Sequence, residues 1–246
     1  MELKKTGKPI VLILSNGRPL ELCRLEPVCD AIVEIWQPGI AGGKPLAGIL
    51  TGRINPSGKL PITFPYATGQ IPIYYNQRKS GRSHQGFYQD ITSKPLYPFG
   101  HGLSYTAFDY AVENAKMDAD RCELKVSVKN IGKVAGREAV QLYVKAPNGG
   151  LDKPAKELKA FGKTALLQPG ESQTLILTWN VMDMASFNEK NSSWELAKGE
   201  YQWMVAASSA DVRCTAVQRV TKARKQKVHD AMRAQVPVAV YPMVKR

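Results

Sequence analysis

The stretch Lys94–Phe108, with the sequence KPLYPFGHGLSYTAF, constrains the fold of this chain more than any other segment. It combines large rings with the turn-forming residues proline and glycine. Its rings belong to Tyr97, Phe99, Tyr105 and Phe108. A flexible linker between independent domains would be polar, so these rings favour a packed junction between two parts of the chain. Composition alone leaves open an ordinary aromatic-rich surface loop.

The segment before this stretch has the pattern of an α/β domain. Pro9–Leu14 is a continuous apolar run, as expected for a parallel strand covered on both faces. Ala31–Trp36 predicts a second strand, Gly42–Leu50 a helix and Leu60–Phe64 a third strand. Three strands form only part of a sheet, whose edge would be exposed. We therefore expect the α/β domain to be incomplete within residues 1–93.

The segment after the aromatic stretch has the pattern of a β-sandwich. Arg121–Lys129 alternates between apolar and polar residues, which predicts a strand with one buried face. The buried side chains are expected to be Cys122, Leu124, Val126 and Val128. Further strands are expected at Glu138–Lys145, Leu158–Phe161, Thr164–Leu167, Thr174–Trp179, Tyr201–Ala206 and Arg213–Val220. Short strands at this spacing, without a long helix, indicate a sandwich.

Several segments resemble one known family. PLYPFGHGLSYTAF is similar to the segment that joins the second and third domains of glycoside hydrolase family 3 enzymes, the β-glucosidases and their relatives. KPIVLILSNGRPL at Lys8–Leu20 resembles the first strand of the second domain, and NPSGKLPITFP at Asn55–Pro65 resembles its end. Val128–Lys145 and Lys156–Trp179 look like the family's fibronectin type III-like domain. The resemblance covers about residues 6–220.

The resemblance implies a fold class and a domain order. It implies a partial, mainly parallel α/β domain over residues 1–93 and a packed aromatic junction over 94–107. An all-β, immunoglobulin-like or fibronectin type III-like sandwich then follows over 108–222, and a basic tail over 223–246. It also implies an activity for the whole enzyme, namely retaining hydrolysis of terminal β-linked glucosides.

The resemblance assigns no catalytic residue to this sequence. Retaining hydrolysis needs two carboxyl groups that flank the scissile bond. In the family the nucleophile is an Asp on an N-terminal barrel, and the acid/base is commonly a Glu ahead of the segment matching Lys8–Leu20. No Asp or Glu here falls in a matching motif. We therefore expect a C-terminal part that is inactive alone and has the barrel domain as its partner. Whether Met1 is a true start stays open.

Substrate-binding candidates lie in the segment Gln70–Asp90, which begins with aromatic residues and becomes basic. Rings suit the CH faces of sugars, and Arg or His side chains supply donors for hydroxyl groups. The resemblance places this region near the barrel, so its candidates for lining a substrate groove are Arg78, Arg82, His84 and Tyr88. A solvated surface loop is the alternative.

Arg18 follows the first predicted strand. Open α/β sheets bind ligands at the carboxyl ends of their strands, so Arg18 is either a ligand-facing cation or a structural residue bonded to loop carbonyls. The second interpretation is favoured. His101, between two glycines, is expected to be hydrogen-bonded structure rather than a catalytic group.

Other chemistries lack their motifs. The glycine-rich start at Gly39–Gly43 belongs to no nucleotide-binding pattern, and the sequence has no GxSxG elbow. The three histidines lack metal-ligand spacing, so no cofactor and no metal is expected. For the four cysteines, free buried thiols are favoured, while an immunoglobulin-type pair of Cys122 and Cys214 stays open.

The net charge of +13 raises the question of a nucleic-acid or membrane-surface partner. Residues 219–246 contain eight Lys or Arg and one Asp, so this end holds +7 of the charge. The remaining charge is dilute, which favours a solvated tail and no nucleic acid. Lys222–Gln235 could form a short basic amphipathic helix. No apolar run approaches the ~20 residues of a membrane span.

Three hypotheses follow from the sequence. The first is the C-terminal part of a β-glucosidase-like hydrolase, for which the family suggests a periplasmic or extracellular location. The second is a stand-alone carbohydrate-binding or scaffolding module without hydrolysis. The third is a basic protein associated with nucleic acid.

Overall fold

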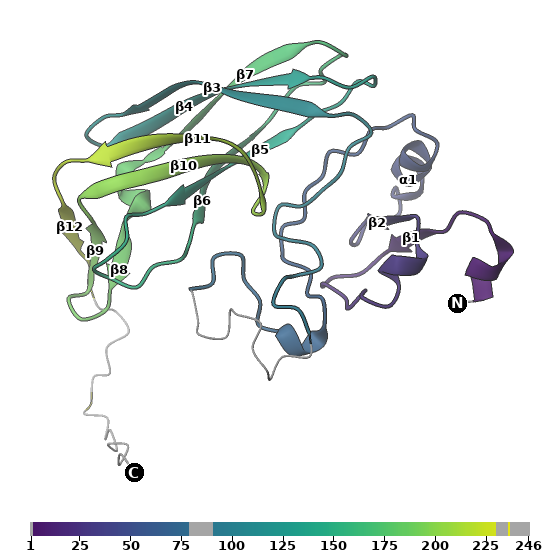
Figure 1. Ribbon diagram of the computed structural model, residues 1–246, viewed down its shortest axis with the longest axis horizontal. Coiled ribbons are helices and arrows are strands. Elements are labelled where there is room, and N and C mark those ends of the chain that lie inside the picture. Colours follow the sequence, from purple (N-terminus) through teal and green to yellow (C-terminus); the bar gives the residue numbers. More distant parts are fainter. Residues whose placement is uncertain (1, 79–90, 230–235, 237–246) are drawn as a thin grey trace.

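The structure, a computed structural model, describes residues 2–78, 91–229 and 236. It has a β-sandwich in the C-terminal half and a smaller α/β part that carries the N-terminus, with irregular segments running between them (Figure 1). The predicted fold class is confirmed, because a small parallel sheet with a helix precedes antiparallel sheets.

The α/β part is built around two parallel strands. Its elements are η1 (Glu2–Thr6), β1 (Val11–Leu14), η2 (Glu26–Val28), β2 (Ala31–Glu34), α1 (Gly43–Leu50) and η3 (Thr68–Gln70). β1 and β2 pair in register from Val11 opposite Ala31. The predicted helix is confirmed, and Pro45 lies in its first turn, where a missing N–H breaks no helical bond.

The two faces of this small sheet differ in burial. Leu14 is buried together with Leu22 and Phe64 in a small apolar cluster. On the other face, Val11 and Ile13 remain 43% and 39% exposed. A parallel sheet is normally covered on both faces, so the second face is apolar and uncovered by the described residues.

The prediction of a third strand at Leu60–Phe64 is wrong. This segment instead runs irregularly against the aromatic stretch: Leu60 N donates to His101 O at 2.7 Å, and Phe64 N donates to Tyr97 O at 2.9 Å. Pro61 and Pro65 lack the N–H that a regular ladder requires. Within the described part of the chain, strand pairing of this segment is limited to a single bridge between Phe64 and Tyr97.

The β-sandwich consists of two main sheets and a small third sheet. Its strands are β3 (Phe108–Met117), β4 (Arg121–Asn130), β5 (Ala139–Lys145), β6 (Glu157–Lys163), β7 (Ser172–Asn180), β8 (Ser186–Asn188), β9 (Ser193–Leu196), β10 (Gly199–Ser208), β11 (Asp211–Val220) and β12 (Arg224–Lys227). The turn η5 (Val181–Met184) follows β7. The sheet β3-β4-β7 faces the sheet β11-β10-β5-β6, and β12-β9-β8 forms the third sheet.

The core between the two main sheets follows the predicted alternation. The four apolar side chains expected to be buried on β4 are all 0% exposed. Trp179 of β7 and Trp203 of β10 meet edge to face, with ring centroids 4.4 Å apart. Because both rings are buried and come from opposite sheets, they hold the sheets in contact. Cys122 and Cys214 belong to this core as free thiols, and no pair forms between them.

Two sandwich predictions are wrong. β6 runs through Gly162, where two strands bracketing this glycine were expected. A Cβ at Gly162 would lie 2.9 Å from Leu177 of the facing sheet. The glycine is therefore needed for the close packing of the two sheets and does not form a turn. The basic segment after Val220 is a strand at Arg224–Lys227, paired with β9, where a helix was expected. The rest of that predicted helix, from residue 230, lies outside the described residues.

The aromatic stretch contacts both parts of the chain. Tyr97 meets Phe64 of the α/β part edge to face, with centroids 6.3 Å apart. Phe99 stacks on Tyr75 at 4.4 Å, and both rings pack against the outer face of the sandwich around Tyr143. Tyr105 is half exposed, and its hydroxyl donates to Ile49 O at 2.9 Å. The boundaries at residues 93, 107 and 222 stay predictions.

A second set of junction contacts comes from the turn Asn55–Lys59. Asn55 Nδ2 donates to Ala135 O at 3.0 Å, and its Oδ1 accepts a hydrogen bond from Tyr105 N at 2.8 Å. Lys59 Nζ lies 2.9 Å from the Glu138 carboxylate, and these side chains are only 14% and 6% exposed. Lys59 Nζ also donates to Gly102 O at 3.0 Å. The motif predicted to end the α/β domain therefore fastens it to the sandwich.

Gly100 completes the junction. Its φ of +79° lies in the left-handed region that favours glycine. Gln141 of β5 sits over it and donates to Gly100 O at 3.1 Å and to Ala207 O at 2.8 Å. The Gln141 Oε1 in turn accepts a hydrogen bond from the buried Tyr143 hydroxyl at 2.6 Å. A side chain at position 100 would collide with Gln141.

The Lys59–Glu138 pair yields a prediction about stability. Lys59→Met leaves the Glu138 carboxylate buried without its cation, and breaking a buried pair typically costs about 3–5 kcal/mol. The double variant Lys59→Met, Glu138→Leu should lose much less, because replacing both ions with apolar groups is often neutral. Urea unfolding of the single and double variants measures the difference.

The matched control for this experiment is Lys5→Met. Lys5 pairs with Glu2 at 2.8 Å, but both side chains are largely exposed, and exposed pairs contribute only about 0–1 kcal/mol. An equal loss in the single and double junction variants would show that Lys59 and Glu138 are not coupled.

Candidate functional site

The carboxyl ends of β1 and β2 form the edge of the α/β part at which such sheets bind ligands. The Glu34 carboxylate, at the end of β2, accepts a hydrogen bond from Asn16 Nδ2 at 3.1 Å and one from Trp36 N at 2.8 Å. Ser15 Oγ donates to Trp36 O at 3.0 Å. The two turns that follow the strands are therefore joined to each other by side chains.

Trp36 adopts a φ of +50°, which is uncommon for a bulky residue. Such a conformation costs of order 1–3 kcal/mol and persists only where the surroundings hold it. Here the bond from Trp36 N to Glu34 holds the backbone, and the ring packs edge to face on Phe64, with centroids 6.2 Å apart. Strained residues gather at functional sites, which marks this edge as the candidate site of the α/β part.

Arg18 lies at this edge and is exposed. Its main-chain N–H donates to Asn16 Oδ1 at 3.2 Å, which closes the turn after β1. The guanidinium group makes none of the expected bonds to loop carbonyls in the part of the chain that the structure describes. The geometry therefore leaves this cation accessible to a ligand.

Of the four predicted groove residues, the structure describes only Arg78. Its guanidinium lies 3.4 Å from the Asp152 carboxylate in the loop between β5 and β6, and both side chains are largely exposed. An exposed pair of this kind contributes about 0–1 kcal/mol, so it orients Arg78 without burying it. Arg82, His84 and Tyr88 lie outside the described residues, and their role as a group stays a prediction.

Tyr75 is the residue at this segment that sequence reasoning missed. Its hydroxyl oxygen accepts a hydrogen bond from Leu158 N at 3.1 Å, and its ring stacks on Phe99. Burial raises the pKa of the Tyr75 hydroxyl. Tyr75 therefore anchors the start of the predicted groove segment to β6 of the sandwich. The only signal in the sequence was a second tyrosine, Tyr74, beside it.

Three described carboxyl groups have clearly shifted pKa values, and all three shifts are downward. Hydrogen bonds from the hydroxyl and N–H of Thr68, both at 2.6 Å, lower the pKa of Glu21. The Ile10 N–H lowers that of Asp30, and Lys225 lowers that of Glu195. A general acid at neutral pH needs a raised pKa. None of these three groups has that property.

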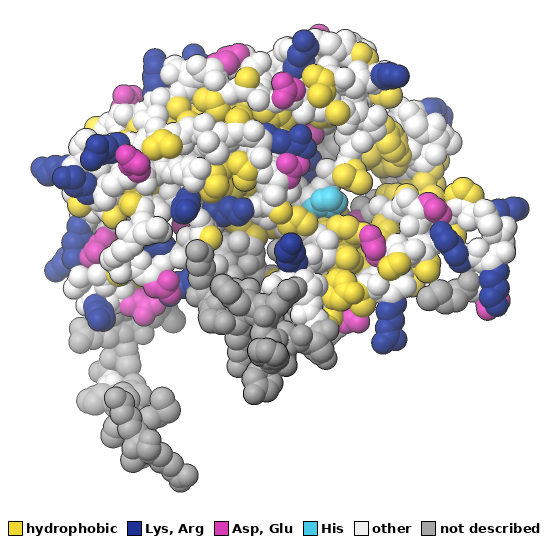
Figure 2. All heavy atoms as spheres, in the orientation of Figure 1, with side chains coloured by type: hydrophobic (Ala, Val, Ile, Leu, Met, Phe, Trp, Pro, Cys, Tyr) yellow, Lys and Arg dark blue, Asp and Glu magenta, His cyan; other side chains and the backbone are white. Residues whose placement is uncertain are grey.

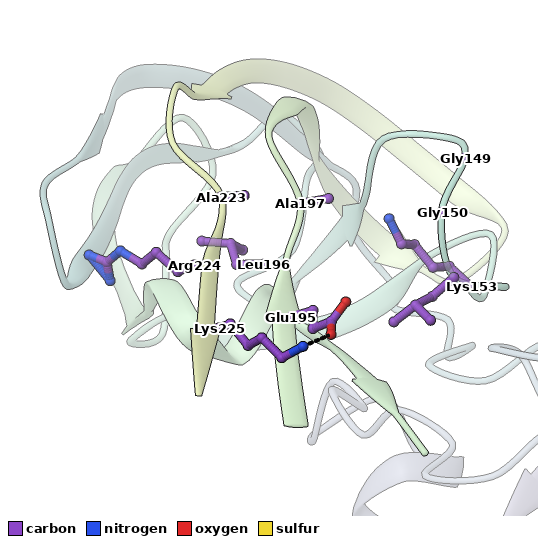
Figure 3. A pocket seen from close by; sticks show the side chains of 10 residues that line it. Gly149, Gly150, Lys153, Glu195, Leu196, Ala197, Ala223, Arg224 and Lys225 are labelled. Carbon is purple, nitrogen blue, oxygen red and sulfur yellow. Dashed lines mark ion pairs between the residues drawn. The ribbon is translucent and has the colours of Figure 1, made fainter. Parts of the chain in front are cut away.

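The sandwich has a hollow of about 300 Å³ between the loop after β5 and the sheet of β9 and β12 (Figure 3). Its cations already have partners. Lys225 lies 2.9 Å from Glu195, Arg224 lies 3.0 Å from Asp120, and Lys153 Nζ donates to Pro147 O at 3.1 Å. Because each of these three cations already has a partner within the protein, the hollow is not a good candidate for an anion-binding site.

Within the described residues, His, Cys, Asp and Glu do not gather in groups of three or more that could hold a metal ion. None of the helices found there has the length and apolar character needed to cross a membrane. Lys and Arg side chains are scattered over the visible face of the molecule and are not gathered in one patch (Figure 2).

His101 lies where the aromatic stretch meets both parts of the chain. Its ring stacks on Tyr97 with centroids 5.1 Å apart, and its main chain accepts from Leu60 and donates to Pro98. Burial lowers the pKa of His101, the Lys59 cation lowers it further, and Asp211 opposes both effects. These contacts agree with a structural role for His101. Its hydrogen bonds come from the main chain, whereas the ring contributes by stacking on Tyr97.

Comparison with known proteins defines the class of this chain. Residues 1–105 match the model for the glycosyl hydrolase family 3 C-terminal domain, and residues 138–209 match the model for the fibronectin type III-like domain. Together these matches define an α/β domain of a glycosyl hydrolase family joined to a β-sandwich. The chain carries the C-terminal domain of glycosyl hydrolase family 3 ahead of a fibronectin type III-like domain.

Curated relatives agree with this assignment. A periplasmic beta-glucosidase from Salmonella typhimurium is 38% identical over 223 residues, which is 86% of this chain and 29% of the relative. Thermostable beta-glucosidase B from Acetivibrio thermocellus is 39% identical over 216 residues, 82% of this chain and 28% of the relative. A putative beta-xylosidase from Formosa agariphila is 36% identical over 221 residues, 88% of this chain and 29% of the relative.

Solved structures show the same region. Beta-glucosidase 3B from Thermotoga neapolitana, in complex with glucose, superposes with a TM-score of 0.79 at 36% identity, covering 92% of this chain and 33% of that one. A beta-glucosidase variant from Listeria innocua, in complex with laminaribiose, gives 0.81 at 34% identity, covering 89% and 32%. The chain therefore spans about a third of the length of these proteins.

The lowered pKa of His101 yields a prediction about pH. The folded protein protonates His101 less readily than the unfolded chain, whose ordinary value is 6.5. This contribution to stability is complete above that value and is lost as the pH falls through it towards the depressed pKa. Thermal unfolding between pH 7.5 and 5 should show a smaller decrease for His101→Phe, which keeps a ring against Tyr97 but cannot titrate.

The exposed His229 provides the control. His229→Gln should follow the pH profile of the unaltered chain. If His101→Phe also follows it, burial of His101 does not govern the response to acid.

Proposed function

We propose that this chain is the non-catalytic C-terminal part of a hydrolase that removes terminal β-linked glucose units. One structural observation carries the proposal, namely the apolar face of the β1–β2 sheet on which Val11 and Ile13 stay exposed. Because a parallel sheet is covered on both faces in stable α/β domains, this face calls for a partner. The proposed partner is the preceding portion of a family 3 hydrolase, including its barrel domain.

The size of the α/β core supports the need for a partner. Among the described residues, its cluster contains three buried side chains, Leu14, Leu22 and Phe64, whereas the sandwich core contains twenty. A small domain buries too little apolar surface to offset its conformational entropy. The α/β part therefore depends on the sandwich through the junction, and on a further partner across its open sheet face.

The carboxyl groups support a non-catalytic role. A retaining mechanism places two carboxyl groups about 5–5.5 Å apart, one of them with a raised pKa. The pKa values of Glu21, Asp30 and Glu195 shift in the opposite direction. The catalytic pair is therefore proposed to come from the partner portion.

The substrate class rests on the relatives. Beta-glucosidases dominate the matches described above, and the Formosa agariphila relative named as a beta-xylosidase makes a β-xyloside the second candidate. Arg78, Arg82, His84 and Tyr88 remain the proposed groove-lining residues, with the accessible Arg18 as a further cation. The name of the Salmonella typhimurium relative supports a periplasmic or extracellular location.

The test is a hybrid enzyme. The region of the Salmonella typhimurium beta-glucosidase that matches this chain is replaced by this chain, and release of nitrophenol from a β-glucoside and a β-xyloside is measured. We expect the isolated chain to be inactive, because general acid–base catalysis alone supplies typically ~10²–10⁴-fold in rate. We expect the hybrid to be active, with the β-glucoside preferred.

A matched pair of variants tests the open face. Ile13→Lys should abolish activity of the hybrid while leaving the sandwich folded, because it places a charge where the partner packs. Ile176→Lys, at an exposed position of β7, should leave activity unchanged. Turnover by the isolated chain that is lost on Glu21→Gln would overturn the proposal. A folded but inactive hybrid would favour a stand-alone carbohydrate-binding or scaffolding module.

A further inference from the structure

Two exposed aromatic rings lie side by side on the small sheet β12-β9-β8. Phe187 of β8 pairs with Trp194 of β9, which in turn pairs with Gln226 of β12. Directly opposed residues of antiparallel strands point to the same face of the sheet, so the three side chains form one row. The ring centroids of Phe187 and Trp194 are 5.3 Å apart, and the two residues are 40% and 43% exposed.

A hollow of about 580 Å³ adjoins the row on the side of Gln226, and Trp194, in the middle of the row, also lines it. Its polar lining includes Glu157 and Lys159 of β6, Asp183 of η5, and Gln226. Two of the three charges compensate each other within the molecule, and the third is held by a hydrogen bond. Lys159 Nζ lies 3.3 Å from the Glu157 carboxylate, and Asp183 accepts a hydrogen bond from Asn180 N at 3.0 Å. The hollow thus offers fixed hydrogen-bonding groups, and its only net charge is the single negative charge of Asp183.

This combination selects among ligand classes. Nucleic acid requires a surplus of cations against its phosphates, which the hollow lacks. A protein partner is also disfavoured, because the buried centres of protein interfaces are depleted in Lys, Glu and Asp. Three of the four polar residues of the hollow, Glu157, Lys159 and Asp183, are of these types. A sugar presents apolar CH faces to aromatic rings and hydroxyl groups to fixed donors and acceptors. The row and the hollow match a neutral sugar chain on both counts.

We propose that the row Phe187–Trp194–Gln226 and the adjoining hollow bind a β-linked glucan chain without hydrolysing it. The carbohydrate class follows from the surface itself, whereas the choice of a β-glucan rests on the proposed function. β8, β9 and β12 lie at the end of the sandwich remote from β1 and β2 (Figure 1). A glucan bound there does not block the α/β part. It would also keep the ends of the glucan chain near the proposed hydrolase.

The test uses the unaltered full chain and laminarin, a soluble β-glucan, in affinity gel electrophoresis, with dextran as the α-linked comparison. We expect retardation by laminarin but not by dextran. Trp194→Ala should weaken the affinity for laminarin at least about tenfold, as expected when a central aromatic anchor is removed. Phe187→Ala should weaken it less. Protection of Trp194 from acrylamide quenching by laminarin gives a second readout.

Phe161→Ala is the matched control. Phe161 on β6 is 73% exposed and lies outside the row, so its removal should leave the affinity unchanged. Because Trp194 is half exposed, its removal does not empty the core, and circular dichroism checks the fold of each variant. The binding assay needs no hydrolysis, so an inactive hybrid enzyme leaves its result unaffected.

Three outcomes would overturn the proposal. The first is absence of retardation of the unaltered chain by laminarin, and the second is equal retardation of the unaltered chain and Trp194→Ala. The third is a dimer in size-exclusion chromatography that Trp194→Ala abolishes, because it would assign the rings to contact between two copies.

Discussion

The arrangement of the two parts of this protein depends on a buried ion pair. Lys59 from the α/β part meets Glu138 from the sandwich, and the same ammonium group donates to Gly102 O in the aromatic stretch. Removing two charges from water is costly unless both are paired and hydrogen-bonded. The pair therefore fits only one relative position of the two parts, and Asn55 and Gln141 add hydrogen bonds that satisfy the same geometry.

This junction explains how a large sandwich and a small α/β part can act as one unit. The sandwich has its own core, held by Trp179 and Trp203, whereas the α/β part buries few side chains and leaves one sheet face open. The sandwich stabilises the α/β part through the stacking of Tyr75 on Phe99 and through the Lys59–Glu138 ion pair. In the proposed hydrolase, the sandwich would hold the α/β part in position for a catalytic partner.

Local patterns predicted the regular elements well and their partners poorly. The alternation in Arg121–Asn130 specifies a buried face whatever lies opposite, and the structure confirms it. Leu60–Phe64 has the composition of a strand, but its neighbour is the irregular aromatic stretch. Arg224–Lys227 has a helical charge pattern, yet pairing with β9 outweighs that weak preference. The role of Tyr75 could not be predicted, because its partners Phe99 and Leu158 are distant in sequence.

The sequence by itself determined the α/β-then-β order, the apolar face of the main strands, the helix at Gly43–Leu50 and the family. These follow from periodicities and motifs that each segment carries within itself. Only the tertiary structure decided that Lys59 meets Glu138, that Trp194 stands beside Phe187 and Gln226, and that Arg18 stays accessible. The physical reason is that periodicity specifies which face of an element is apolar, whereas the packing of whole elements selects which distant side chain it meets.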